Sequence, residues 1–169
     1  MPPPLKTPPK VLLLALGNEL LSDDSVGLRV AAALRERFSA QPNLTVTESH
    51  EMGLSLLDLI VGFEDLVLLD AIQTGQAAPG FVHELDGDDL KALPAVSPHF
   101  LGVGEVLALG RKLGMQVPAR VEILAIEVQD PFTLATELTP ALAIALPQII
   151  ERVALAVTQV MCFDSKSPS

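Results

Sequence analysis

Blocks of hydrophobic residues alternate with mixed polar segments along the chain, and the blocks predict strands. Residues 11–16 and 65–70 are apolar almost throughout, which is typical of strands buried on both faces of a parallel sheet. Residues 44–48 alternate and are rich in β-branched side chains, so they predict a second strand nearer a sheet edge. Residues 81–85 and 120–127 predict the fourth and fifth strands.

The segments between these strands carry helical patterns. Residues 22–38 place an apolar side chain at every fourth position, as an amphipathic helix does, and Ser22 is the expected N-cap. The apolar stripe of this helix comprises Val26, Val30, Leu34 and Phe38. Similar patterns predict helices over residues 53–60 and 100–113 and a long amphipathic helix over residues 139–160.

The order of these elements indicates an α/β fold. Residues 71–80 are rich in Gly and Pro and too few to hold a crossover helix, so the fourth strand should run antiparallel. We therefore predict a three-layer sandwich, in which helices cover both faces of a mixed, mostly parallel, five-stranded twisted sheet. The length of 169 residues suits one domain, predicted over residues 11–162 between a proline-rich tail at residues 1–10 and a C-terminal tail at residues 163–169.

Charge and composition narrow the range of partners. The formal net charge of −10 argues against nucleic acid and against an anionic membrane, because clustered Lys and Arg are needed to neutralise phosphates. The apolar run at residues 11–16 is far shorter than the roughly 18 residues that span a bilayer. The single cysteine, Cys162, is predicted to be a buried or half-buried apolar residue and fits a reducing compartment. The expected location is the cytoplasm.

Two carboxylates and one imidazole stand at the ends of predicted segments. Asp24 follows the first strand, Asp70 ends the third, and His99 precedes a helix. With a strand order of 2-1-3, the first and third strands are neighbours, and ligands bind beyond the carboxyl ends of such strands. Two carboxylates about 4 Å apart repel by about 4 kcal/mol at an effective dielectric near 20, which a bound cation or a shared proton relieves. We therefore predict that the three side chains converge on one divalent metal.

Each of these residues also has an ordinary structural explanation when taken singly. Asp24 would stabilise a helix dipole, Asp70 would cap a turn, and His99 would be a common residue at a helix start. It is the three together, each at a segment end on one side of the sheet, that favour a site. His83 and Glu19 are predicted to be surface or edge-strand residues.

The predicted donor set of two carboxylates and one imidazole restricts the chemistry. Such a set could hold Zn²⁺ or Ni²⁺ with coordination positions left open. The His-Glu-x-x-His zinc motif, the phosphate-binding loop, the dinucleotide-binding glycine fingerprint and the serine-hydrolase elbow are all missing from the sequence. An ordinary zinc protease, a nucleotide-binding protein and a serine hydrolase therefore lose their main support.

Three motifs then occur in order with fitting separations. They are Gly17-Asn18-x-Leu20-x-x-Asp23-Asp24, Asp70-Ala71-Ile72 with Gly75 and Pro79-Gly80 downstream, and Ser97-Pro98-His99 with Leu101-Gly102. Over residues 11–160 the chain resembles the hydrogenase maturation endopeptidases, the C-terminal processing proteases of the large subunit of [NiFe] hydrogenases. In that family the residues at the positions of Asp24, Asp70 and His99 are metal ligands.

The resemblance also implies an activity and a partner. The enzyme would remove a short C-terminal tail from the large-subunit precursor of a [NiFe] hydrogenase after nickel insertion, with the nickel presented by the substrate. Another divalent metal, such as zinc or cadmium, is the alternative occupant in a purified or crystallised form. Asp24 and Asp70 are the candidate catalytic residues. Either a carboxylate activates water as a base, or the metal polarises the peptide carbonyl, and both routes stay open.

The chain departs from the family pattern at a few positions. Ser25 stands where many members have Gly, and Ala125 and Val128 replace a Gly and a Pro that are common after the fifth strand. Two other functions stay open. One is a metal-binding maturation chaperone or carrier that cuts nothing. The other is a flavodoxin-like small-molecule binder with a phosphate at the Gly17 turn, which the adjacent acidic pair disfavours.

Overall fold

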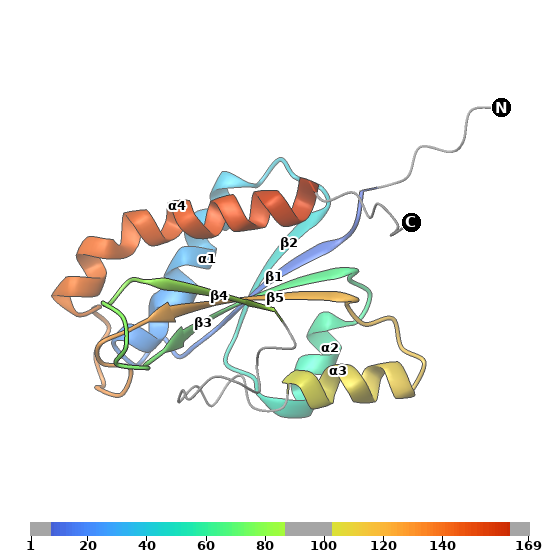
Figure 1. The fold of residues 1–169 in the computed structure, drawn as a ribbon, viewed down its shortest axis with the longest axis horizontal. Coiled ribbons are helices and arrows are strands. Elements are labelled where there is room, and N and C mark those ends of the chain that lie inside the picture. The colour runs from blue at the N-terminus through green and yellow to red at the C-terminus, as the bar shows by residue number, and fades with distance from the viewer. Residues whose placement is uncertain (1–7, 87–102, 163–169) are drawn as a thin grey trace.

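The computed structural model describes residues 8–86 and 103–162. Over this part of the chain, strands and helices follow one another in the predicted order (Figure 1). The strands are β1 (Val11–Leu16), β2 (Leu44–Ser49), β3 (Asp65–Ile72), β4 (Val82–Asp86) and β5 (Arg120–Glu127). The helices are the 3₁₀ turns η1 (Asp23–Ser25) and η2 (Gly53–Ser55) and the α-helices α1 (Val26–Arg37), α2 (Leu56–Ile60), α3 (Val103–Lys112) and α4 (Pro140–Cys162).

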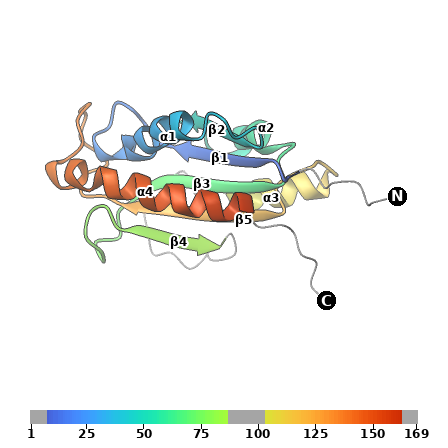
Figure 2. The same ribbon diagram turned by 90° about the horizontal axis from the view of Figure 1, so that it is seen from above.

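The five strands form a single mixed sheet in the order β2-β1-β3-β5-β4. The pairs β1–β2, β1–β3 and β3–β5 are parallel, and β4 pairs with β5 in the antiparallel direction at one edge. Figure 2 shows this edge position of β4 beside β5. The predicted 2-1-3 order and the antiparallel fourth strand are therefore confirmed.

Helices cover both faces of the sheet, as predicted, and each face has its own core. α1 and α4 lie on one face, and α2 and α3 lie on the other (Figure 1). Successive residues of a strand point to opposite faces, so Leu13 and Ala15 pack toward α1 and α4, while Leu14 and Leu16 pack toward α2 and α3. Every residue of β1 is buried, which explains why its sequence is apolar throughout.

Several predicted details of the first helix and third strand are wrong. Ser22 does not cap a helix, because its hydroxyl donates to the carbonyl oxygen of Glu137 at 2.8 Å and the helical segment opens with the turn η1. The strand predicted to end at Asp70 continues to Ile72, since Ala71 and Ile72 still pair with Ile126 and Glu127 of β5.

The C-terminal helix gives a second correction. Cys162, predicted to be buried or half-buried, is exposed at the last position of α4. By length and composition alone, α4 is apolar enough to cross a membrane. One side of it, however, packs on the sheet and includes Leu142, Ile149, Val153 and Val157, so its apolar content is also that of a core helix.

Two of the sequence-based expectations fall largely outside the described residues. His99 is one of them. The tails are the other, because residues 1–7 of the N-terminal tail predicted over residues 1–10 and the whole C-terminal tail at residues 163–169 are not among the described residues. The end of the predicted N-terminal tail is described and is held in place. The carbonyl oxygens of Pro9 and Lys10 accept hydrogen bonds from Asn43 and Glu64, respectively.

Candidate active site

The carboxyl ends of four parallel strands meet at one edge of the sheet, and the candidate residues lie there. Leu69 of β3 is in register with Ala15 of β1, so Asp70 stands beside the end of β1. On its other side Asp70 is in register with Ala125 of β5. Ligands of such sheets bind at this edge where the strand order reverses, and in the order β2-β1-β3-β5-β4 the reversal lies between β1 and β3.

Asp70 is a buried carboxylate in β3, whose other residues after Asp65 are all apolar. It is 0% exposed, and its Oδ1 accepts a hydrogen bond of 2.8 Å from the amide of Ala71. Its neighbours Leu68 and Ile72 belong to the core under α2 and α3, so the alternation of the strand puts Asp70 on that face. Burying a charge is costly unless it is satisfied, so its presence here indicates a purpose beyond packing.

Asp24 lies in η1, on the loop that leaves β1. It is 8% exposed, and its Oδ2 accepts a hydrogen bond of 2.8 Å from the amide of Asn18. This bond closes the loop over the end of β1, two residues beyond Leu16. The structure thus brings Asp24 and Asp70 to the same edge of the sheet, from the loop after one strand and from the end of its neighbour.

Two glycines let this loop and the following helix come close to the strand ends. A Cβ on Gly17 would lie 2.3 Å from the carbonyl oxygen of Asp24. A Cβ on Gly27 would lie 3.2 Å from the carbonyl oxygen of Leu16 and 3.4 Å from that of Leu69. The start of α1 is therefore pressed against the ends of β1 and β3, and the position of Asp24 depends on Gly17.

Replacing Gly17 with alanine should destabilise the protein by about 1–3 kcal/mol, because the added methyl group overlaps a backbone atom that cannot rotate away. Thermal or denaturant unfolding of the purified variant measures this. Gly104→Ala is the matched control, since a Cβ at that helical position meets nothing within 4 Å and alanine favours a helix. Equal stability of Gly17→Ala and the wild type would contradict the close approach.

A surface hollow lies beside the Asp24 loop. Its volume is about 460 Å³, within the range of about 300–1,000 Å³ that ligand sites have. The lining comes from the β1 loop, from α1 and from the end of β2. These residues are Gly17, Asn18, Glu19, Leu20, Leu28, Glu48, Ser49 and His50. Asn18, one of the lining residues, donates its backbone amide hydrogen to Asp24, so the hollow adjoins the loop that carries this carboxylate.

Asp23, the other member of the acidic pair, has a structural role. Its side chain is 0% exposed and accepts four hydrogen bonds from the segment after β5. The donors are the amides of Gln129 at 3.0 Å, Asp130 at 2.9 Å and Thr139 at 2.8 Å, and the hydroxyl of Thr139 at 2.9 Å. Asp23 therefore ties the β1 loop to the loop between β5 and α4. Because Asp23 and Asp24 are adjacent and identical in sequence, the sequence does not show that their roles differ.

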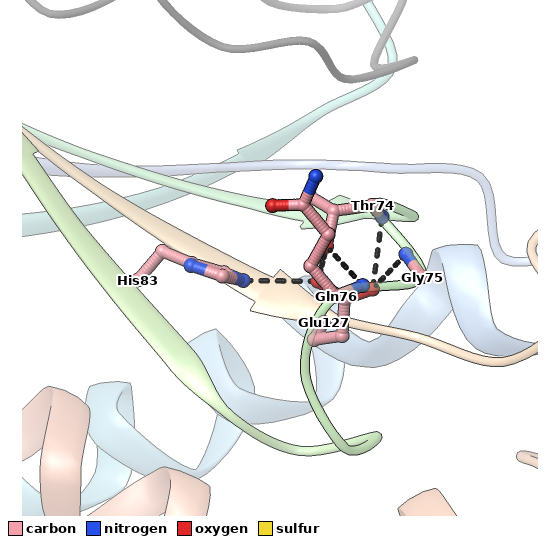
Figure 3. A network of polar contacts seen from close by, with 5 residues as sticks. All are labelled: Thr74, Gly75, Gln76, His83 and Glu127. Carbon is pink, nitrogen blue, oxygen red and sulfur yellow. Dashed lines mark hydrogen bonds and ion pairs between the residues drawn. The ribbon is translucent and has the colours of Figure 1, made fainter.

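A second polar cluster, centred on Glu127, was not predicted as functional. Glu127 ends β5 and its side chain is 1% exposed. Figure 3 shows how the loop after β3 and the edge strand β4 both reach this carboxylate. Its Oε1 accepts from the amides of Thr74 at 2.8 Å and Gly75 at 2.9 Å, and its Oε2 contacts the Thr74 hydroxyl at 2.6 Å and His83 Nε2 at 2.9 Å. The signal in the sequence is an acidic residue directly after an apolar run, as at Asp70.

The charge state of Glu127 follows from these contacts. Burial acts most strongly and raises the pKa of the carboxyl. The hydrogen bonds from Thr74, His83 and Gly75 together outweigh burial, so the pKa lies below its ordinary value of 4.5. The group is therefore a carboxylate at neutral pH, and the ring nitrogen of His83 that faces it carries a hydrogen.

Acidification should weaken the fold through Glu127. Because its pKa is lowered by folding, the carboxylate adds stability above about pH 4.5 that is lost as the pH falls through the folded-state pKa. We expect the stability difference between wild type and Glu127→Gln, measured by denaturant titration, to shrink below about pH 4.5. Glu122, whose pKa is raised mainly by burial, affects both proteins alike and cancels. A difference that stays constant on acidification would contradict this.

Only two of the three predicted metal ligands, Asp24 and Asp70, lie among the described residues. No group of three His, Cys, Asp or Glu side chains within residues 8–86 and 103–162 is placed to hold a metal ion. The third predicted ligand, His99, lies outside these ranges. Asp24 and Asp70 supply oxygen donors of the kind that divalent metals accept, and a carboxylate base for water is the chemistry they offer by themselves.

Comparisons with known proteins agree with this architecture. The family model for hydrogenase maturation protease matches residues 28–156. The hydrogenase 2 maturation protease of Escherichia coli K12 is 27% identical over 152 residues, which cover 89% of this chain and 92% of that protein. The hydrogenase expression/formation protein HupM of Azotobacter chroococcum is 30% identical over 161 residues, with 88% and 75% covered.

Solved structures show the same relationship. The hydrogenase maturating endopeptidase HybD from E. coli superposes with a TM-score of 0.73 at 25% identity, covering 89% of this chain and 93% of that one. The [NiFe] hydrogenase maturation protease HybD from Thermococcus kodakarensis gives a TM-score of 0.65 at 27% identity, with 87% and 98% covered. The family model, the sequence relatives and the shared fold confirm the resemblance noted in the sequence motifs. The chain belongs to the hydrogenase maturation protease family and is a peptidase.

Proposed function

We propose that this peptidase removes the C-terminal tail of the large-subunit precursor of a [NiFe] hydrogenase, after nickel has been inserted, through a site made by Asp24, Asp70 and His99. The observation that carries the proposal is the placement of two buried acidic side chains at one edge of the sheet. Asp70 interrupts the apolar run that follows Asp65 in β3, and Asp24 lies on a loop closed by the hydrogen bond that it accepts from the amide of Asn18.

In this proposal the nickel belongs to the substrate. Asp24 and Asp70 would offer it carboxylate oxygens and His99 an imidazole nitrogen, a mixed donor set that suits a divalent first-row metal. His99 comes shortly before α3 in the sequence, and α3 packs on the face of the sheet that bears Asp70. A substrate docked through its own metal would place its tail beside the two carboxylates, and such positioning lowers a barrier substantially.

The two acids have two possible duties in the hydrolysis. Asp24 or Asp70 would take a proton from the attacking water as a general base, which commonly contributes about 10²–10⁴-fold to a rate. In the other route they would hold the substrate so that its nickel polarises the scissile carbonyl. Both routes need the pair, so both predict that neutral isosteres at these positions are inactive.

The partner would be the precursor protein itself, and the reaction would take place in the cytoplasm. One cysteine in 169 residues fits a reducing compartment. A net charge of −10 disfavours nucleic acid as a partner. The relation to proteases also favours an enzyme over a carrier that binds metal without cutting.

The test is to mix the purified protein with nickel-loaded precursor and to follow the mass of the precursor by mass spectrometry. We expect loss of a C-terminal fragment, and no loss from the same precursor prepared without nickel. An E. coli hydrogenase 2 maturation protease with its own precursor serves as the positive control. If that control turns over while nickel-loaded cognate precursor keeps its full mass, the proposal is wrong. Tight stoichiometric nickel binding without cleavage would instead indicate a carrier.

A further inference from the structure

The pair formed by Glu127 and His83 lies outside the proposed metal site, yet it has the features of a substrate contact. Glu127 is a buried carboxylate, and its bond of 2.9 Å to His83 Nε2 comes from the edge strand β4. The ring of Phe81 meets the ring of His83 edge-on, with centroids 4.8 Å apart. The imidazole is therefore held in one orientation by two contacts, as Figure 3 shows for the contact with Glu127.

Of the two ring nitrogens of His83, Nε2 is hydrogen-bonded to Glu127, and Nδ1 has no hydrogen-bond partner among the described residues. The Glu127 carboxylate accepts hydrogen bonds but donates none, so Nε2 must carry the hydrogen. Among residues 8–86 and 103–162, no other hydrogen bond to the His83 side chain occurs. The side chain is 21% exposed, whereas that of Glu127 is 1% exposed. Nδ1 is thus the nitrogen with which His83 would meet an incoming molecule.

The sheet places His83 in the same row as Asp70. Ala125 of β5 is in register with Asp70 on one side and with His83 on the other, and side chains in register lie on the same face. The backbones of Asp70 and His83 are thus two strand spacings apart, about 10 Å. An extended peptide covers that distance in about three residues. In this row of the described strands, Ala125 stands between the two polar residues, and its side chain is a methyl group.

On the basis of the proposed protease function, we propose that His83 is a substrate-contacting residue that binds a main-chain peptide group of the substrate tail through Nδ1, and that Glu127 is its positioning residue. The substrate tail would lie across the row Asp70–Ala125–His83. His83 would then contact it a few residues from the peptide bond that is cut near Asp70. Its role is to bind the tail, so its loss raises KM more than it lowers kcat.

A purely structural role for the pair makes a different prediction. Glu127 already fastens the loop after β3 through the amides of Thr74 and Gly75 and the hydroxyl of Thr74. If His83 only completes this anchor, any side chain that donates a hydrogen bond to Glu127 will serve. Glutamine does so, because its side-chain amide reaches about as far as Nε2, but it places no polar atom where Nδ1 lies.

The experiment compares full-length variants in the nickel-loaded precursor assay. His83→Gln keeps the donor to Glu127 and removes Nδ1, while His83→Asn keeps a polar atom near Nδ1 and loses that donor. Glu127→Gln makes Nε2 accept from the new amide and moves the hydrogen to Nδ1. Glu84→Gln is the control, because Glu84 lies on the same strand, is exposed and pairs with Arg152 on the surface.

We expect kcat/KM of His83→Gln to fall about five- to tenfold through KM with an unchanged melting temperature. His83→Asn should recover part of the loss, Glu127→Gln should lower kcat/KM by a similar factor, and Glu84→Gln should match the wild type. If the wild type cleaves and folded His83→Gln stays within about twofold of its kcat/KM, the inference is wrong and the proposed function stands. If the wild type itself leaves nickel-loaded precursor intact, the proposed function fails first. His83→Gln decides the outcome even if Glu127→Gln does not fold.

Discussion

Asparagine at Asp70 should lower the rate of tail removal at least about 100-fold and leave the protein folded. The amide oxygen of asparagine can still accept the hydrogen bond from the amide of Ala71 that Asp70 accepts at 2.8 Å, so the strand end keeps its geometry. What is lost is the negative charge, which both a general base and a metal ligand need. Asp24→Asn should act in the same way, because its oxygen can still accept from the amide of Asn18.

Single-turnover assays with nickel-loaded precursor measure this effect, and circular dichroism checks the fold. Asp58→Asn is the matched control, since Asp58 is an exposed carboxylate on α2 whose neutralisation should change the rate by less than about twofold. Wild-type turnover by either Asp24→Asn or Asp70→Asn would remove that residue from the proposed site. Wild-type turnover by both variants would show that neither carboxylate is needed for cleavage and would contradict the proposed site.

Alanine at Asp23 should lower the free energy of unfolding by about 3 kcal/mol or more. The carboxylate satisfies three backbone amides and one hydroxyl around it, and each buried donor left without a partner costs about 1–3 kcal/mol. The loop between β5 and α4 would also lose these side-chain hydrogen bonds to the β1 loop. We therefore expect the change to reach Asp24 indirectly, with activity falling together with stability.

Urea unfolding of purified variants tests the size of this effect. Asp23→Asn should be intermediate, because its oxygen can replace Oδ2, which takes three of the four bonds, while its amide group opposes the amide of Thr139. Asp58→Ala is the exposed control and should change stability by less than about 0.5 kcal/mol. A loss below about 1 kcal/mol for Asp23→Ala would mean that water replaces the carboxylate and that the tie is weak.

The fold was predictable because its signals are local. β1 and β5 have the bounds expected from their apolar runs, and α1 buries three of the four residues in its predicted stripe. Apolar residues recur about every two positions in a strand and every 3.6 positions in a helix when one side of the element is buried. Both patterns can be recognised in a short stretch of sequence. The direction of β4 followed from the length of the connector before it.

The end of β3 and the cap at Ser22 were predicted wrongly for the opposite reason. β3 runs past Asp70 because β5 continues to offer partners as far as Glu127. Ser22 turns to a carbonyl that is 115 residues away. Neither partner can be seen in the local pattern that suggested the strand end or the cap.

The two members of the acidic pair illustrate the same limit within the site. In the sequence, Asp23 and Asp24 are adjacent and chemically identical. Asp23 takes its four hydrogen bonds from residues more than 100 positions away, whereas Asp24 bonds the nearby Asn18. The sequence did not predict the polar cluster around Glu127, because its partners Thr74 and His83 come from another loop and another strand.

By itself the sequence determined the fold class, the succession of strands and helices and the antiparallel direction of the fourth strand, since apolar periodicity and connector length suffice for these. Motifs spaced along the chain also indicated the protease family. Only the tertiary structure decided which member of the acidic pair anchors a loop, and that Glu127 holds His83 in the row of Asp70. Those roles depend on hydrogen-bond donors that come from distant parts of the chain and meet only in the folded protein. The pattern of residues along the sequence therefore cannot predict them.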